Sequence, residues 1–474
     1  MKTCKKGFAV FLIIFLYFIS STMALANSGP TYWRGYPSAE ILAVDENCPV
    51  EVAREDLTFD LSGNYKNSYT IGGNVKAAYE MLNPTNKDLT VQMAFPIVSS
   101  LNDFSPDDIA VTVDGTSLPF DLYIGDVADS GGSSFQKGGG ESLVFKDILS
   151  AVTNQTYQAK HFSENETGKL YILQVNPAAE QKINLAIDFE LDKEKSRVLT
   201  KGFNRYERKN KSVRIAAWCY EPETLEIFVL GDDIDFNITG YTDGELKQKT
   251  DLFTYEISSK QAELKPYLME YMKNYRQAQN IPESEIFDEV QLYNQYSAAL
   301  DSMLAGGEGF AACEDLISQH QYNRVITLLY EVDFPANSNK NVTVSYKITG
   351  TMDRTKTSKP VYTFQYILNP AQNWNRFGAL DIEIATPEEN PYIVDSSIEM
   401  TKESDRHYTA SLDSLPEKDL TFSLYEQEKI SPLENFAPIR YINRYFPAAG
   451  TVIIIAAAAL AGVALFSGRL RKKK

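Results

Sequence analysis

Histidine is scarce in this sequence, and the three histidines lie far apart. His161, His320 and His407 have no second histidine or cysteine at metal-ligand spacing. The His-Glu-x-x-His pattern of zinc peptidases and the Gly-x-Ser-x-Gly pattern of serine hydrolases are both absent. We therefore expect no cofactor, and no motif assigns a catalytic residue. The sequence leans away from an enzyme without excluding one whose residues meet only in the fold.

Cysteine is also sparse, which excludes a disulfide-rich scaffold. Of four cysteines, Cys4 lies in the predicted leader, so the exported chain would keep Cys48, Cys219 and Cys313. Three widely spaced cysteines allow one pair at most. We expect them to be small buried thiols.

Positive charge is the third shortage. The chain has 46 Lys and Arg residues against 63 Asp and Glu residues, for a net charge of −17. Removing the predicted leader and tail leaves 38 basic and 63 acidic residues over 27–450, a net charge of −25. Proteins that bind nucleic acid present basic surfaces, so we expect no nucleic-acid partner.

The first 26 residues have the three parts of a secretory signal peptide. Three lysines precede an apolar run at 7–19, and Ala24 and Ala26 form the small-x-small pattern before a cleavage site. We expect the mature chain to begin at Asn27. The protein is therefore predicted to be exported.

The last residues predict a membrane anchor. The 18 residues 451–468 are apolar and uncharged, and as a helix they would reach roughly 27 Å, enough for a thin bilayer core. The basic tail 469–474 follows at once and is expected to stay cytoplasmic. This arrangement predicts a single-pass protein with its N-terminal ectodomain outside and the membrane as a partner.

A motif just before the apolar span offers a second interpretation. Phe446, Pro447, Ala448, Ala449 and Gly450 resemble the Leu-Pro-x-Thr-Gly signal of Gram-positive sortases, although Phe replaces Leu and Ala replaces Thr. The resemblance implies cleavage between Ala449 and Gly450 and attachment of Ala449 to the cell wall by a sortase. We favour the plain membrane anchor over this alternative.

Alternating apolar residues predict antiparallel strands in both halves of the exterior. In VKAAYEMLNPTNKDLTVQMAFPI (75–97) the alternation continues on both sides of a turn at 83–88, which predicts a hairpin with one buried face. RVITLLYEVDFPANSNKNVTVSYKITG (324–350) has a similar pattern, which suggests an internal repeat of two β-sandwiches. Asp114-Gly115 marks a further turn.

Helical spacing of apolar residues interrupts the strands from about residue 259 to 322, with breaks at 281–284 and 306–309. The predicted fold is therefore mainly β, with two β-sandwich-like regions, a helical insertion and one C-terminal transmembrane helix. The predicted divisions are a signal peptide (1–26), an N-terminal β-sandwich-like region (27–128), a loop, short helix and further strands (129–258), the helical insertion (259–322), a C-terminal β-sandwich-like region (323–428), a stalk with the sorting-like motif (429–450), the membrane helix (451–468) and the tail (469–474).

Asp233, Asp235 and Asn237 have the spacing that opens a calcium-binding EF-hand loop. Ile238 stands where that loop requires glycine, and Gly244 stands where it requires a bidentate glutamate. An EF-hand is therefore excluded, and a looser calcium site at a strand end stays open.

Three stretches carry a family resemblance. GPTYWRGYPSAEILAVDENCPVEVAREDLTFDL (29–61), VKAAYEMLNPTNKDLTVQMAFP (75–96) and YILNPAQNWNRFGALDIEI (366–384) resemble an uncharacterised family of exported Firmicutes proteins. The resemblance implies a fold and a location but no catalytic residue. We expect a non-enzymatic cell-surface protein whose ectodomain binds an unknown protein or glycan or serves as an envelope structure. The alternative is a cell-wall-active hydrolase or transferase.

The C-terminal interpretation predicts a peptide mass. Cells would be fractionated, the wall digested with a muralytic enzyme, and the C-terminal peptide weighed. A plain anchor leaves a peptide ending at Lys474 in the membrane fraction. A peptide that ends at Ala449 and carries a wall fragment would instead establish sortase cleavage.

Overall fold

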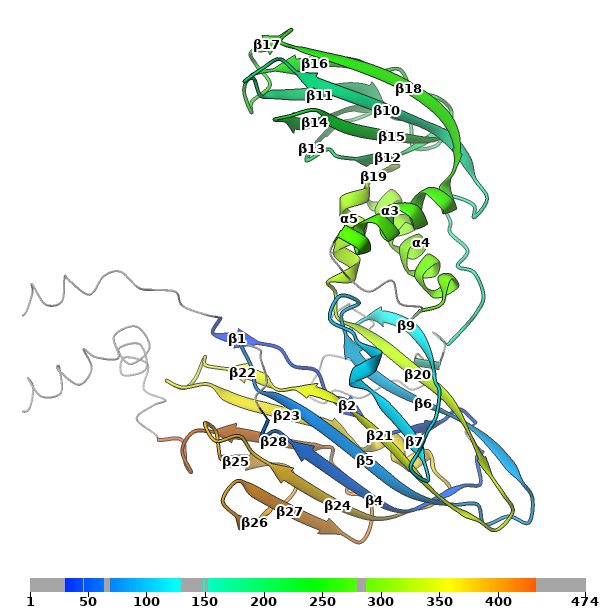
Figure 1. Ribbon diagram of the computed structural model, residues 1–474, viewed down its shortest axis with the longest axis vertical. Helices are drawn as coiled ribbons and strands as arrows, with labels where there is room; N and C mark the ends of the chain where they lie inside the picture. The colour runs from blue at the N-terminus through cyan, green and yellow to red at the C-terminus, as the bar shows by residue number, and fades with distance from the viewer. Residues whose placement is uncertain are drawn as a thin grey trace, which may run out of the picture. The chain divides into compact units, whose positions relative to one another are not determined.

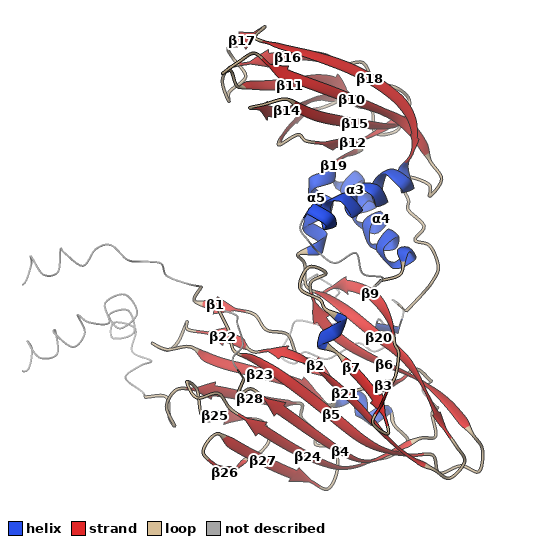
Figure 2. Ribbon diagram, viewed as in Figure 1, coloured by secondary structure: helices blue, strands red, loops and turns tan. Residues whose placement is uncertain are grey.

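The computed structural model describes residues 30–45, 47–63, 69–128, 148–149, 152–278 and 287–431. Over these residues the chain is mainly β, as predicted, with its longer helices gathered in one region (Figures 1 and 2). It divides into unit 1 (1–95, 106–120 and 330–474) and unit 2 (96–105 and 121–329). No helix among the described residues has the length and apolarity to cross a membrane. The predicted leader, sorting motif and membrane span lie outside them.

Unit 1 contains an eight-stranded and a six-stranded sheet. In sheet order, the eight strands are β26 (Thr401–Ser404), β27 (His407–Leu412), β24 (Phe377–Ala385), β4 (Glu51–Asp60), β5 (Gly72–Leu82), β21 (Asn339–Thr349), β7 (Ala110–Val113) and β8 (Thr116–Ser117). The six-stranded sheet has the order β1 (Tyr32–Trp33), β22 (Thr351–Asp353), β23 (Val361–Ile367), β28 (Leu420–Tyr425) and β25 (Tyr392–Ser396), and β2 (Ser38–Ala39) also pairs with β23. Two short 3₁₀ turns, η1 (Pro106–Asp108) and η3 (Asn369–Asn373), also belong to this unit.

Aromatic contacts join these two sheets. Phe59 on β4 meets Tyr366 on β23 and Phe422 on β28 edge-on, with ring centroids 6.0 and 5.2 Å apart. All three rings are buried, because the alternation along each strand turns them to the inner face. The core of unit 1 therefore lies between its sheets.

The two segments that looked like a repeat pair with each other. β5 and β21 are antiparallel over eleven residues, from Gly72 opposite Thr349 to Leu82 opposite Asn339. The strands on the other side of each corner, β6 (Leu89–Ser99) and β20 (Arg324–Phe334), are neighbours in a four-stranded sheet of order β3 (Leu42–Ala43), β6, β20 and β9 (Asp121–Val127). The boundary between the units falls within β6 and β20.

The predicted hairpin at 75–97 is wrong, although its buried alternation is confirmed. β5 and β6 belong to different sheets, so the chain turns a corner between them. Asn83 fixes this corner: its Nδ2 donates to the carbonyls of Lys87, Phe334 and Pro335 at 2.8–3.1 Å. The partner of β5 therefore comes from far along the chain. By contrast, the turn at Asp114-Gly115 is confirmed between β7 and β8.

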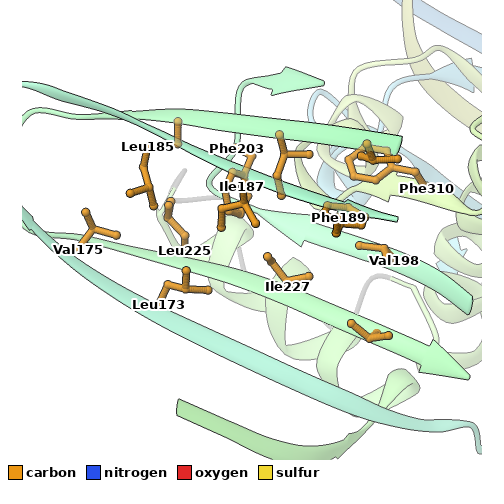
Figure 3. Close-up of a cluster of buried hydrophobic side chains, with 14 of the residues drawn as sticks. Leu173, Val175, Leu185, Ile187, Phe189, Val198, Phe203, Leu225, Ile227 and Phe310 are labelled. Carbon is orange, nitrogen blue, oxygen red and sulfur yellow. The ribbon is translucent and has the colours of Figure 1, made fainter. Parts of the chain in front are cut away.

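Unit 2 contains two five-stranded sheets that enclose one apolar core. The first has the order β18 (Phe253–Glu263), β10 (Thr167–Pro177), β15 (Glu223–Gly231), β12 (Ser196–Lys201) and β19 (Phe310–Ala312). The second has the order β13 (Arg205–Lys209), β14 (Ser212–Cys219), β11 (Ile183–Glu190), β16 (Asn237–Tyr241) and β17 (Lys249–Thr250). Figure 3 shows Leu173, Leu225 and Ile227 of the first sheet facing Leu185 and Ile187 of the second. This region is a β-sandwich.

Helices cover the outer face of the first sheet. They are α3 (Leu264–Ala278), α4 (Glu289–Gly306) and α5 (Cys313–Ile317), followed by the turn η2 (Ser318–His320). Leu264, Leu268 and Met272 recur along α3 and pack with Phe228 of β15 in a second apolar core. The predicted helical insertion is thus present, but it starts later than expected, because residues 259–263 continue strand β18 and pair with β10.

The predicted regions 27–128 and 323–428 are not separate bodies in the structure. β4 pairs with β24 and β5 pairs with β21, so strands from both regions alternate in one sheet. The sequence signal for strands was local, whereas their partners lie about 250 or more residues away in the chain.

The corner predicts that removing the side-chain amide of Asn83 lowers stability strongly. Asn83 is fully buried, so Asn83→Ala leaves three carbonyls without this donor and should lower the free energy of unfolding by about 2 kcal/mol. Urea denaturation would measure it. Asn86→Ala, in the same turn but exposed, is the matched control and should change stability little. Equal effects of the two variants would contradict the assigned role of Asn83.

Candidate functional site

Unit 1 holds two carboxyl groups that are completely shielded from solvent. Glu55 lies on β4 at an inward position, in phase with Leu57 and Phe59, and stands directly opposite Tyr79 of β5. Glu40 follows β2, and its backbone N–H donates to the carbonyl of Ile367 at the end of β23. Both glutamates are 0% exposed. The two sheets of unit 1 thus bring an acid pair into their shared core.

Two tyrosines connect the acids. Tyr79 donates to Glu40 Oε2 at 2.7 Å, and its hydroxyl lies 3.2 Å from that of Tyr366. Tyr366 in turn donates to Glu55 Oε1 at 3.5 Å. The second oxygen of each carboxyl has no hydrogen-bond partner. Four side chains therefore form one buried network that is only partly satisfied.

Burial decides the protonation of this pair. It raises the pKa of Glu40 from 4.5 to about 7, against the lowering effect of hydrogen bonds from Glu55 and the tyrosines. Burial also raises the pKa of Glu55 well above its usual range, and the charge of Glu40 raises it further. Two adjacent buried carboxyls cannot both ionise at low cost, so the pair keeps a proton. Because neither acid is exposed, no solute meets the pair in this structure.

Unit 2 has a different polar cluster beneath its helices. His320 Nε2 lies 2.7 Å from the hydroxyl of Tyr296, and the two rings stack with centroids 5.5 Å apart. Burial lowers the pKa of His320 to about 4, with further lowering by the cations Arg276 and Arg324. The imidazole is therefore neutral at physiological pH and serves as a hydrogen-bonding group rather than a proton carrier.

A groove opens beside this cluster, between α3 and α4. Residues at helical spacing line it: Met269, Met272, Lys273 and Arg276, with Glu270, on α3, and Glu289, Leu292 and Tyr296 on α4. Its volume is about 440 Å³, within the range of small-molecule sites. Methionine, leucine and tyrosine give apolar walls, while two carboxylates and two cations surround them. Such a lining suits a small molecule with an apolar body and polar ends.

The predicted calcium residues stay close in sequence, but Asp233 already has a cationic partner. Its carboxylate accepts from Lys169 Nζ at 2.7 Å and from the Tyr171 hydroxyl at 2.5 Å. Asp235 is exposed, and Asn237 begins β16 opposite Asp188. Within the described ranges, no group of three or more His, Cys, Asp or Glu side chains is arranged to hold a metal ion. The calcium site stays a prediction.

Cys48, Cys219 and Cys313 are buried and unpaired, as expected for small core thiols. Cys313 Sγ lies 3.7 Å from the hydroxyl of Tyr267, whose hydroxyl also donates to Glu226. Burial raises the pKa of the Cys313 thiol, which makes it a poor nucleophile.

Sequence reasoning overlooked both the acid pair and the groove. One signal for the pair was present, because the alternation of Leu57, Phe59 and Leu61 places Glu55 on the inner face. No local pattern marks Glu40, which is buried by tertiary structure.

Comparisons with known proteins give no functional assignment. No family model and no curated protein matches the chain. Among solved structures, it is similar to a "putative nutrient binding protein" of Legionella pneumophila, with 10% identity over 88% of this chain and 75% of the other. The TM-score of this comparison is 0.31.

The acid pair predicts a pH dependence of stability. A carboxyl with a raised pKa in the folded state stabilises fully below its unfolded pKa, near 4.5, and this contribution is lost as pH rises through about 7. The shift of Glu40 corresponds to about 3 kcal/mol. The free energy of unfolding should therefore fall across this window.

Urea unfolding at several pH values would measure the slope. The double variant Glu40→Gln/Glu55→Gln should be much flatter between pH 4.5 and 7. Glu80→Gln, on the exposed side of β5, is the matched control and should keep the wild-type slope. If the double variant keeps that slope as well, the acid pair is not its origin.

Proposed function

We propose that this protein is a non-enzymatic binding protein of a bacterial envelope, with the groove between α3 and α4 as its ligand site. The observation that supports the proposal is that the buried acid pair and the open groove lie in different places. The groove is lined by methionine, leucine and tyrosine among balanced charges, whereas the acid pair with shifted pKa values is sealed in unit 1. Catalysis requires that both occur at one accessible place.

The groove supports a particular class of ligand. Its walls bear Met269, a partly buried and flexible side chain that adapts its shape to different apolar partners. Charges of both signs at its sides favour a molecule that is neutral overall or zwitterionic rather than a polyanion. The neutral His320 behind Tyr296 fixes that buried side chain through a hydrogen bond to its hydroxyl.

The location in this proposal rests on sequence alone. The leader with Ala24, Ala26 and Asn27, together with the apolar span 451–468, supports an exported ectodomain held at the membrane. Residues 446–450 support wall attachment by a sortase as the alternative. The resemblance to exported Firmicutes proteins is consistent with either anchor.

Filling the groove tests the proposal. The exterior residues 27–450 would be titrated with anilinonaphthalene sulfonate, an amphipathic dye that fluoresces in apolar sites, and then with small zwitterionic competitors. Leu292→Trp places a larger side chain in the groove and should weaken dye binding at least about tenfold, since 1.4 kcal/mol is a factor of ten. Leu252→Trp makes the same change on an exposed site and should have no effect.

Two results would contradict this function. Dye binding that is unchanged in Leu292→Trp would place the apolar site elsewhere. Release of soluble fragments from purified cell wall by the wild-type chain would favour the wall-active enzyme instead.

A further inference from the structure

Strand β18 is an unusual sheet edge. It pairs with β10 along all eleven residues without a register shift, and its other side has no neighbouring strand in the described part of the chain. Nine of the eleven residues are exposed. Proteins normally protect such edges with proline, bulges, short strands or charged side chains, because an open edge can pair with another strand, and of these β18 has only the charges of Glu256, Lys260 and Glu263. β18 contains no proline and no bulge.

The other sheet ends show the usual protection. Across the described ranges, the nine other terminal strands are only two to seven residues long: β1, β3, β8, β9, β13, β17, β19, β25 and β26. Register shifts also interrupt the pairing of β9, β25 and β26. The open edge of β18 is therefore a local exception within this molecule.

The exposed side chains of β18 include part of an apolar face. Tyr255 stands opposite Val175 and Ile257 opposite Leu173 on β10, and opposite residues share a face of the sheet. Val175 and Leu173 are fully buried in the sandwich core, yet Tyr255 is 43% and Ile257 44% exposed. The core-facing side of the sheet thus continues past the cover of the second sheet.

The charges of β18 are self-complementary. In an antiparallel pair, hydrogen-bonded and non-bonded pairs alternate, so two identical strands related by a two-fold axis must place one residue opposite itself. When Ser258 is that residue, Glu256 lies opposite the partner's Lys260, and Lys260 lies opposite the partner's Glu256. Moving the centre by one residue in either direction removes both matches.

Other features agree with this register. Neither Glu256 nor Lys260 has an ion-pair partner among the described residues, and both are exposed. The register also places Ile257 diagonal to the partner's Ile257, within reach of long side chains on one face. Opposite charges directly across a pair of strands stabilise it, whereas like charges destabilise it.

We propose that β18 is a self-association edge, which pairs antiparallel with β18 of a second copy about a two-fold axis at Ser258. The five-stranded sheet of one copy then continues into that of the other through main-chain hydrogen bonds. The interface is isologous, so it closes on itself and leaves neither β18 edge open, and only the three-residue strand β19 remains at each end of the joined sheet. It uses a different surface from the groove and does not depend on the proposed ligand site.

Charge exchange tests the register. The full chain, purified in detergent, would be weighed by mass photometry across a dilution series. Glu256→Lys places lysine opposite lysine twice and should raise the dimer dissociation constant at least about tenfold. The double variant Glu256→Lys/Lys260→Glu restores opposite charges and should restore the dimer. Unchanged melting temperatures would show that these exposed substitutions leave the fold intact.

Disulfide trapping gives an independent measurement. Ser258→Cys places the thiol opposite its own copy and should cross-link rapidly under mild oxidation, because the native cysteines 48, 219 and 313 are buried. Thr254→Cys, exposed on the same strand, would lie roughly 26 Å from its own copy at 3.3 Å per residue. It should therefore cross-link at least about ten times more slowly.

Three outcomes would overturn the proposal. They are a wild-type chain that stays monomeric, a dimer that is indifferent to Glu256→Lys, and equal cross-linking rates at positions 254 and 258. A monomer that binds an added extended peptide, with its β18 amides protected from hydrogen exchange, would also contradict self-pairing. In that case β18 would pair with a strand of another protein.

Discussion

The antiparallel pairing of β5 with β21 is the constraint on which the rest of the structure depends. It joins residues 72–82 to residues 339–349 without a register shift. The corner at Asn83 then separates β5 from β6, and the matching corner after β20 lies against it. Everything from residue 121 to 329 belongs to unit 2 and is enclosed, in sequence, by strands of unit 1. The two segments that resemble each other in sequence are thus the strands whose pairing joins the two ends of unit 1.

The proposed binding function rests on a difference between the two units: the acid pair belongs to unit 1 and the groove to unit 2. In unit 1 the acid pair is buried, and Tyr79 and Tyr366 hold its two carboxyl groups between the sheets. A partly satisfied buried network costs stability, so its presence constrains how the sheets can pack against each other. Unit 2 instead has an apolar core on each face of its first sheet and a groove among its helices. The proposed ligand groove therefore lies in unit 2.

Much of the local structure could be predicted from the sequence, and most of the long-range pairing could not. Alternation at 75–81 correctly identified a strand with one buried face, and the glycines at 306–309 correctly marked the end of α4. The prediction of a hairpin was wrong because alternation shows which face of a strand is buried but not which strand it pairs with. Glu55 was predictable as an inward residue, whereas Glu40 was not, since only tertiary structure buries it. The groove could not be predicted because it depends on how α3 and α4 pack against each other, and the sequence pattern of either helix alone does not specify that packing.

The enclosure of one unit within the other also has a consequence for the order of folding. Unit 2 is drawn mainly from one continuous stretch of chain, so its contacts can form as soon as residue 329 is available. The sheet of unit 1 waits for β21 and β24, and the long loop between β5 and β21 slows their encounter with β4 and β5. If the chain crosses a membrane from its N-terminus, β4 and β5 emerge early and can pair with each other, but they meet β24 and β21 only much later. During that interval their apolar faces need protection from other unfolded chains.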